Sequence, residues 1–352
     1  MTAAETGFVL PGVSRRGAQA RTLLVSAAGV VLAFLVGGLL VLVAGGRPVA
    51  AFRSMFSGTL GSGFAIGELL VTAAPLLLIG LGLALAFRGR VYNIGAEGQL
   101  FVGALAGGTV ALELGGPGPL LIALAMVAGI AGGALWASVV GVLRARFRVN
   151  EVISSLLMNY VGIFGFDYVV RKPLGDPAAG NALASRQLPD ETMLPSIPHL
   201  FAHVGIFVAL GAVPVVWYAM RVTPFGFRVR MMGLNPEATQ VAGVDTRRLI
   251  VVLMAVSGGL AGLAGVIQVV GVEGRMDGGI SASYGFTAIV VALLGRLTAP
   301  GVLAAALLIA FLNVGGQAMS VDNGLPYSIV LAIEGVFVLF VLIADRFARA
   351  AR

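Results

Sequence analysis

Long apolar runs alternate with short polar segments over most of this chain. Ten of the runs, some of them short or broken, could each cross roughly 30 Å of hydrocarbon as a helix. The pattern therefore predicts an all-α polytopic membrane protein with about ten transmembrane helices. A short run that only re-enters the membrane would change this count to nine or eleven. The predicted spans cover residues 23–45, 64–87, 98–113, 119–142, 150–170, 204–220, 249–270, 284–297, 300–318 and 326–344.

The distribution of basic residues supports this count and gives an orientation. With the N-terminus in the cytoplasm, 17 of the 23 Lys and Arg residues fall on the cytoplasmic side. Cytoplasmic loops of membrane proteins retain positive charge in this way. We therefore predict one transmembrane domain over residues 1–352, with both termini cytoplasmic. Its main segments outside the bilayer are predicted to be a cytoplasmic N-terminal segment (1–22), a proline-rich external loop (171–203) and a cytoplasmic loop (221–248).

Composition agrees with a lipid environment. The chain is 58% hydrophobic and 11% charged, whereas soluble domains carry about 25% charged residues. The net charge of +7 would suggest a nucleic-acid partner in a soluble protein. Here it reflects the cytoplasmic loops, so we expect the lipid bilayer as a partner and no nucleic acid. The absence of cysteine excludes disulfides and thiol chemistry.

Residues for nucleotide or metal chemistry are missing from the sequence. A P-loop needs Gly-Lys-Ser/Thr, but the only lysine, Lys172, is followed by Pro173. The only histidines, His199 and His203, are separated by Leu200 and its neighbours and lack the glutamate of a zinc motif. A structural role at the membrane interface is favoured for them over weak metal binding. We expect no catalytic residue, no metal and no cofactor on this chain.

Small residues form two stripes at helical spacing. One stripe repeats every four residues, and the other lies in the span 249–270. Small residues at this spacing let membrane helices approach closely, so packing is the favoured explanation of both stripes. The stripes consist of Ala125, Gly129, Gly133, Ala137 and Gly141, and of Ser257, Gly258, Gly259, Gly262 and Gly265.

A polar, glycine-containing segment at 88–99 interrupts two apolar runs. Asn93 is predicted to cap the following helix and Glu97 to lie in its first turn. Broken helices are tolerated in a membrane where protein or a water-filled cavity satisfies the backbone, and such breaks often line transport paths. Asn93, Glu97 and Gln99 are therefore candidates for a substrate path. An ordinary cytoplasmic turn explains the segment equally well.

Polar residues also mark the fifth span. Asn150 is predicted to cap it, and Ser155 and Asn159 lie four residues apart on one face. Polar groups in membrane helices usually face the bundle interior. Both residues are candidates for the substrate path, although contact between helices is slightly favoured.

The loop 221–248 contains a short helix signal. Asn235 is predicted as the N-cap, Pro236 as the first helical residue and Glu237 as an acid in the first turn. Gly243 is placed to end a helix of about two turns, and Asp245 to cap the next span. This pattern favours a docking element for a cytoplasmic partner over a helix that merely lies on the surface.

Four segments together resemble the membrane subunits of ABC importers of the ribose, branched-chain amino acid and nucleoside group. They occur in the family's order from the second span to the ninth, and the first is most similar to nucleoside-type permeases. The segments are Asn93–Gln99, Asn150–Tyr160, Thr223–Gly243 and Tyr284–Gly295.

The resemblance implies a permease for ATP-driven uptake of a small polar solute, nucleosides first, across the bacterial inner membrane. Its implied partners are a cytoplasmic ABC ATPase that holds ATP and Mg, a related second permease forming a heterodimer, and an extracytoplasmic binding lipoprotein. The loop that couples the permease to the ATPase would contain Gly226, Arg228, Gly233, Asn235, Pro236, Glu237, Ala238 and Gly243.

Other functions remain open from the sequence alone. A permease for a simple sugar or a branched-chain amino acid would share the same motifs. An ion-coupled secondary transporter would rely on Glu68, Glu97 or Glu334, which lie within or next to predicted spans. A scaffold without transport activity is a third possibility, against which the broken helix argues weakly.

Overall fold

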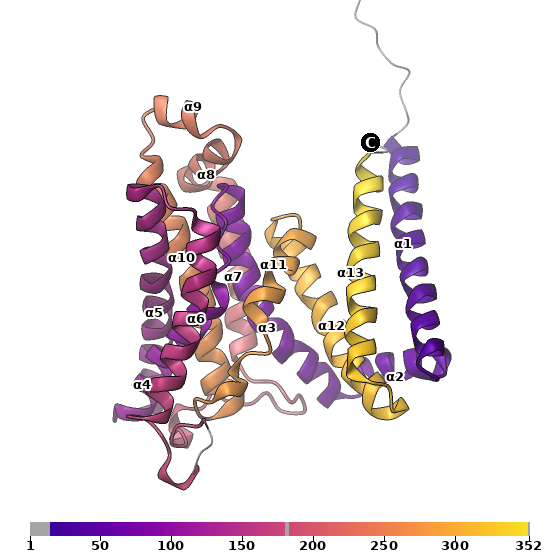
Figure 1. The fold of residues 1–352 in the computed structure, drawn as a ribbon, viewed down its shortest axis with the longest axis horizontal. Helices are drawn as coiled ribbons and strands as arrows, with labels where there is room; N and C mark the ends of the chain where they lie inside the picture. The colour runs from indigo at the N-terminus through magenta and orange to yellow at the C-terminus, as the bar shows by residue number, and fades with distance from the viewer. Residues whose placement is uncertain (1–14, 180–182, 351–352) are drawn as a thin grey trace, which may run out of the picture. The chain divides into compact units, whose positions relative to one another are not determined.

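The structure is a computed structural model that describes residues 15–179 and 183–350, and over these residues it is built almost entirely from helices (Figure 1). Pairing of extended segments there is limited to three isolated bridges. The α-helices are α1 (Arg15–Val43), α2 (Pro48–Leu60), α3 (Gly63–Arg88), α4 (Ala96–Glu113), α5 (Gly118–Phe147), α6 (Glu151–Arg171), α7 (Gly205–Val222), α8 (Pro224–Leu234), α9 (Pro236–Val241), α10 (Thr246–Gln268), α11 (Tyr284–Leu294), α12 (Ala299–Asn323) and α13 (Tyr327–Ala350). Short turns add η1 (Pro177–Ala179), η2 (Asp190–Thr192), the π-helical η3 (Val269–Glu273) and η4 (Gly278–Ile280).

The helices form two compact units. Of the described residues, the smaller unit joins 15–56 to 315–350, and the larger unit comprises those between Ser57 and Val314. In the smaller unit α1 packs along α13. The ring of Phe34 meets those of Phe52 and Phe337 edge-on, with centroids 5.0 and 4.8 Å apart. These aromatic contacts join α1, α2 and α13 into one cluster.

The core of the larger unit lies where α10 packs against α3, α4 and α5. The two predicted stripes of small residues face one another there. A Cβ atom built on Gly133 would lie 2.9 Å from Cα of Gly262, and one built on Gly258 would strike Ala137 and the backbone of Gly133. Only small residues permit this approach of the backbones. The prediction that both stripes serve packing is confirmed.

Among the residues that the structure describes, seven helices are long and apolar enough to cross a membrane: α3, α5, α6, α7, α10 with η3, α12 and α13. The count becomes eight if Val31–Val43 and Pro48–Leu60, which meet at 115°, form one span. Each of the ten predicted runs lies on a helix, but α4 begins with polar residues and α11 has only 11 residues. The all-helical, multi-span architecture is confirmed, and the count of ten stays a prediction.

Some helix boundaries differ from the sequence prediction. Helix α1 begins at Arg15, so the predicted N-terminal segment 1–22 is helical at its end, and its residues 1–14 lie outside the described residues. Helix α2 was not predicted, because its polar residues interrupt the apolar pattern. Helix α8 was also missed, although Thr223 and Pro224 supply its N-cap and first residue.

Between α6 and α7, the described residues form no helix longer than the short turns η1 and η2, as the prolines of the segment 171–203 require. This segment instead pairs with the segment that follows α10. The amide of Ser185 donates to the carbonyl of Met276 at 2.8 Å, and the amide of Leu188 donates to that of Gly274 at 2.8 Å. The described residues of this segment therefore pack over the end of α10.

Candidate functional site

The break between α3 and α4 is the centre of the candidate site. Arg90 adopts a left-handed φ of 54°, and residues 91–95 have no regular structure before α4 begins at Ala96. The prediction that Asn93 is the N-cap is wrong, because Gly95 holds that position and α4 starts later than expected. The Oδ1 atom of Asn93 instead accepts from the amide of Gly95 at 2.9 Å, within the break itself.

The side chain of Asn93 joins the break to two helices. Its Nδ2 donates to Oε1 of Gln99 at 2.8 Å and to Oγ of Ser257 on α10 at 3.0 Å. Gln99 Nε2 donates back to Asn93 Oδ1 at 2.9 Å. All three side chains are buried. Because a buried amide without partners costs free energy, this reciprocal pairing specifies one position for the start of α4.

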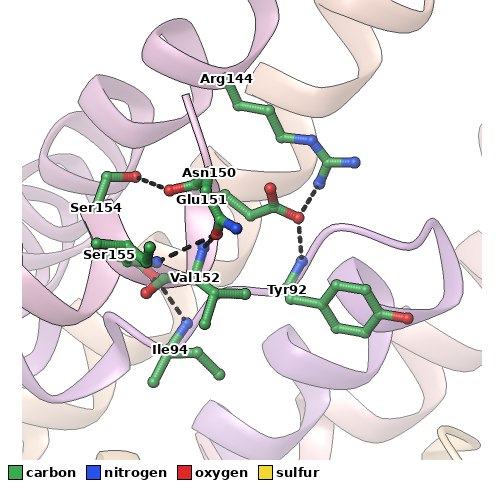
Figure 2. Close-up of polar contacts among 9 residues, drawn as sticks. Tyr92, Ile94, Arg144, Asn150, Glu151, Val152, Ser154 and Ser155 are labelled. Atoms are coloured by element: carbon green, nitrogen blue, oxygen red, sulfur yellow. Dashed lines mark hydrogen bonds and ion pairs between the residues drawn. The ribbon is translucent and has the colours of Figure 1, made fainter. Parts of the chain in front are cut away.

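Helix α6 satisfies the free backbone groups of the break. Ser155 Oγ accepts from the amide of Ile94 at 3.0 Å, as Figure 2 shows. Asn159 Nδ2 donates to the carbonyl of Ile94 at 2.8 Å, and its Oδ1 accepts from the amide of Gly98 at 2.8 Å. A helix break inside a bundle needs such partners. The structure thus supports the favoured role of Ser155 and Asn159 in contact between helices.

The start of α6 anchors the other side of the break (Figure 2). Asn150 caps α6 as predicted, since its Oδ1 accepts from the amides of Val152 at 2.9 Å and Ile153 at 3.3 Å. Glu151 Oε1 accepts from Arg144 Nη1 at 2.6 Å and from the amide of Tyr92 at 3.4 Å. The carboxylate of Glu151, the first residue of α6, therefore contacts both α5 and the break.

Glu97 connects the break to α11. Its Oε1 accepts from Ser281 Oγ at 2.6 Å, and its Oε2 accepts from the amide of Gly285 at 2.6 Å. The residue at the N-cap position of α11, Ser283, makes no capping bond with its own side chain. A carboxylate at a helix N-terminus is stabilised by the amides and the helix dipole. Glu97 therefore caps α11 from a distant segment.

Gly285 makes this contact possible. A Cβ atom built on it would lie 2.6 Å from Cα of Glu97, which no side chain tolerates. Two of the four segments singled out in the sequence, around Glu97 and Gly285, thus meet in space. The sequence places Glu97 in the first turn of a helix, which is confirmed, but it does not show that α11 is the partner.

The five candidate path residues form one buried polar network. Their relative exposures are all 4% or less. Their hydrogen bonds run among α4, α6, α10 and α11, so the network positions these helices. Its members are Asn93, Glu97, Gln99, Ser155 and Asn159. Glu68 lies on α3 and Glu334 on α13.

The segment 221–248 has the predicted short helix, α9. Asn235 Oδ1 accepts from the amide of Ala238 at 3.0 Å, Pro236 is the first helical residue and Glu237 lies in the first turn. Gly243 follows the helix with φ of 83°. The amide of Arg248 donates to Oδ1 of Asp245 at 3.0 Å, which caps α10 as predicted.

Helix α8 seats this segment on the bundle. A Cβ atom on Gly226 would lie 2.5 Å from the carbonyl oxygen of Ala219, and one on Gly233 would strike the carbonyl oxygen of Arg88. Both glycines therefore serve close packing, α8 against α7 and against the end of α3. Arg228 is exposed on the same helix. The role of these residues in coupling to a partner stays a prediction.

Two large apolar side chains of this segment are highly exposed. Leu234 is 81% exposed and Val241 is 90% exposed. Leu234 is the last residue of α8 and Val241 the last residue of α9, whose Pro236, Glu237 and Ala238 are also exposed. Large apolar side chains this open mark surfaces that meet other molecules.

The fold and these two sites define a polytopic membrane transport protein with a buried helix break and a protruding capped helix. The chain belongs to the family described as branched-chain amino acid transport system / permease component, whose model matches residues 65–344. It is an ABC importer permease, a multi-pass protein of the inner membrane and not an enzyme.

Three relatives match the chain over nearly its whole length. It is 38% identical to the glucose ABC transporter permease protein TsgB13 of Haloferax volcanii, over 91% of this chain and 87% of the relative. It is 35% identical to the guanosine ABC transporter permease protein NupP of Bacillus subtilis (91% and 92% covered). It is 31% identical to the nucleoside ABC transporter permease protein NupB of Lactococcus lactis (92% of each).

Each of these three organisms also has a second, less similar permease that matches this chain, at 24 to 32% identity. No solved structure matches the chain.

Proposed function

We propose that this chain is the path-forming subunit of an ATP-driven importer of nucleosides. The substrate class is inferred from the similarity to a guanosine permease and to a nucleoside permease. In each comparison the match covers more than nine-tenths of this chain and of the relative. The similarity to a glucose permease makes a simple sugar the second candidate. Both candidates are neutral molecules that carry several hydroxyl groups.

The proposed topology has ten crossings and both termini in the cytoplasm. The excess of basic residues on one side of the predicted spans supports it. In this arrangement α4, which begins with polar residues, packs against α10, and the short helix α11 packs against α3. A helix that is covered by protein need not be apolar on every face. Helices α8 and α9 then lie in the cytoplasm, and the segment 171–203 lies outside.

Helix α9 is proposed as the coupling helix that docks on the ATPase. The exposed side chains of Leu234 and Val241 would enter an apolar groove of that partner, with Glu237 at the rim. ATP and Mg belong to the ATPase in this scheme, because the only lysine of this chain stands before a proline. This chain would bind no cofactor of its own.

The structure offers a route by which docking could move the path. Gly233 on α8 packs on the carbonyl of Arg88, directly before the helix break. The break leads through α4 to Glu97, and the carboxylate of Glu97 holds the start of α11. A shift of α8 would therefore be transmitted to α4 and α11 through Arg88. We propose that Asn93, Gln99, Ser155 and Asn159 keep this route rigid.

A second permease and a binding lipoprotein complete the proposed importer. The presence of a second matching permease in each of three organisms supports a heterodimer of related chains. Selection of the substrate would then be shared with the extracytoplasmic binding protein.

Uptake into vesicles tests this proposal. The chain is reconstituted with its ATPase, second permease and binding protein, and uptake of labelled guanosine and glucose is measured. We expect guanosine uptake to require ATP on the side of the membrane that carries the ATPase, and to continue when an ionophore is added. Uptake of glucose without uptake of guanosine would show that the substrate is a sugar and not a nucleoside. Uptake that persists without ATP, or that an ionophore abolishes at constant ATP, would establish an ion-coupled secondary transporter instead.

A further inference from the structure

A cavity of about 390 Å³ lies in the larger unit, apart from the polar network of the helix break. This volume is within the range of small-molecule sites. The cavity forms where three helices that could cross the membrane begin or end. Arg88 is the last residue of α3, Arg221 lies one residue before the end of α7, and Ala299 is the first residue of α12. The cavity is therefore at the level of one membrane surface.

Three arginines converge on the cavity: Arg88, Arg221 and Arg230. Arg88 and Arg230 are half-buried and repel one another electrostatically. Arg230 donates to the carbonyl oxygen of Met220, and the guanidinium of Arg221 lies 5.6 Å from the ring centroid of Trp217. No acidic side chain lines the cavity, and the ion pairs found among the described residues involve other arginines.

The start of α12 adds to the positive potential. Ala299 and Pro300 line the cavity with Thr298, whose Oγ1 accepts from the amide of Gly301 at 3.3 Å. The N-terminus of a helix carries a partial positive charge. Leu297, next to it, adopts a left-handed φ of 54°, which holds the turn over the cavity. Like charges and a helix N-terminus gathered in one hollow favour the binding of an anion.

The walls of the cavity are apolar on the side toward the bundle. Ala84, Leu85 and Val216 lie there, about one turn before the ends of α3 and α7. The exposed Trp217 and Arg221 lie at the rim. Tryptophan and arginine commonly occupy the headgroup level of membrane proteins. A cationic floor, an apolar wall and an aromatic rim suit a molecule with an anionic head and an apolar body.

We propose that this cavity binds the phosphate headgroup of an anionic phospholipid from the surrounding leaflet. Arg88 and Arg230 contact the phosphate, Arg221 closes the rim, and the glycerol and first acyl carbons lie along Leu85 and Val216. Basic pockets between membrane helices recognise lipid headgroups in this manner. The lipid would also brace α8 against α3 and α7, because Arg230 belongs to α8.

Tryptophan fluorescence can test this directly, because the chain has only two tryptophans. Trp136→Phe leaves Trp217 as the single tryptophan of the full-length chain, which is excited selectively over the tyrosines. The protein is reconstituted into phosphatidylcholine vesicles that contain either brominated phosphatidylglycerol or brominated phosphatidylcholine. We expect the anionic lipid to quench Trp217 at a severalfold lower mole fraction than the neutral one.

Variants separate the cavity from general surface charge. Arg88→Gln and Arg230→Gln should each reduce the preference by roughly fivefold. Arg230→Lys keeps the charge and should retain most of the preference, which guards against misfolding as the cause of a loss. Arg247→Gln removes an exposed arginine at the start of α10 and should leave the preference unchanged.

Three results would overturn the proposal. Equal quenching by both lipids would remove the anionic preference. If the preference for the anionic lipid persists in Arg88→Gln and Arg230→Gln, the lipid binds elsewhere. These arginines would then be assigned to contact with an acidic partner protein. Loss of the preference on adding inorganic phosphate, at an ionic strength matched with chloride, would assign the cavity to free phosphate.

Discussion

Glu97 joins two segments whose contacting residues are 184 positions apart in the chain. Its carboxylate replaces a local cap for α11 and accepts from both Ser281 and Gly285. Hydrogen bonds to a charged group contribute more than neutral ones. The position of α11 therefore depends on one distant side chain.

Glu97→Gln removes the charge but keeps the shape. We expect the free energy of unfolding to fall by roughly 1–3 kcal/mol, because the carboxamide offers one acceptor and turns a donor toward the helix N-terminus. Thermal unfolding of the purified chain in detergent measures this. Glu113→Gln is the control, since the ion pair of Glu113 with Arg186 is exposed and contributes about 1 kcal/mol or less. Equal stability of Glu97→Gln and the wild type would contradict the capping role.

His203 gives a prediction about pH. Burial lowers the pKa of this imidazole below the usual value of about 6.5, and its Nδ1 accepts from the amide of Gly205 at 3.2 Å. The unfolded chain therefore takes up the proton first as the pH falls. Stability from this group is present above about pH 6.5 and is lost as the pH drops below that value.

Thermal unfolding at pH 7.5 and 5.5 checks this effect. The decrease between the two pH values should be smaller in His203→Gln than in the wild type. His199→Gln, at an exposed position in the same segment, should keep the full decrease. An unchanged pH response in His203→Gln would show that the imidazole is free to ionise in the folded protein.

At the level of elements, local signals in the sequence were sufficient for the caps and the packing stripes. Asn150, Asn235 and Asp245 cap their helices because the acceptor and the amides lie within three residues of one another. The contacts of Asn93 with Ser257, and of Glu97 with Gly285, depend on how distant helices pack. A single sequence does not show how distant helices pack. The residues of the buried network could therefore be predicted, but the groups to which they hydrogen-bond could not.

The sequence did not predict two helices, because their polar or glycine residues interrupt the apolar pattern. Helix α2 carries Arg53, Ser54 and Ser57, so it was predicted as part of a loop. Helix α8 is short and contains Gly226 and Gly233, which disfavour a helix unless close packing requires them. In both cases tertiary contacts determine the structure, and the local sequence preference is weak.

Helix α9 allows a test of coupling at this same scale. Val241→Asp places a charge on a side chain that is 90% exposed, so the free energy of unfolding should change by less than about 0.5 kcal/mol. If α9 docks in an apolar groove, the variant should lose binding of the ATPase and transport. Val241→Thr has nearly the same shape and should lose much less. Normal ATP-driven uptake by Val241→Asp would remove this surface from the coupling interface.

At the level of the whole molecule, the number of membrane crossings follows from the side on which α11 ends. Within the described part of the chain, seven or eight helices satisfy length and apolarity alone, whereas ten crossings require α4 and α11 to traverse the bilayer inside the bundle. The short helix α11 packs against α3 and α4, so protein can satisfy its ends in place of water. The buried hydrogen bond between Glu97 and Gly285 joins α4 and α11.

The absence of native cysteine makes this topology directly measurable. We expect Arg296→Cys and Gln240→Cys to react with a membrane-impermeant maleimide only from the cytoplasmic side. Glu191→Cys and Asp322→Cys should react only from the outside. All four residues are exposed in the structure, so poor reactivity would not follow from burial in the chain. If Arg296→Cys reacts from the outside, α11 re-enters instead of crossing, α12 must begin outside, and the orientation of the C-terminal helices is reversed.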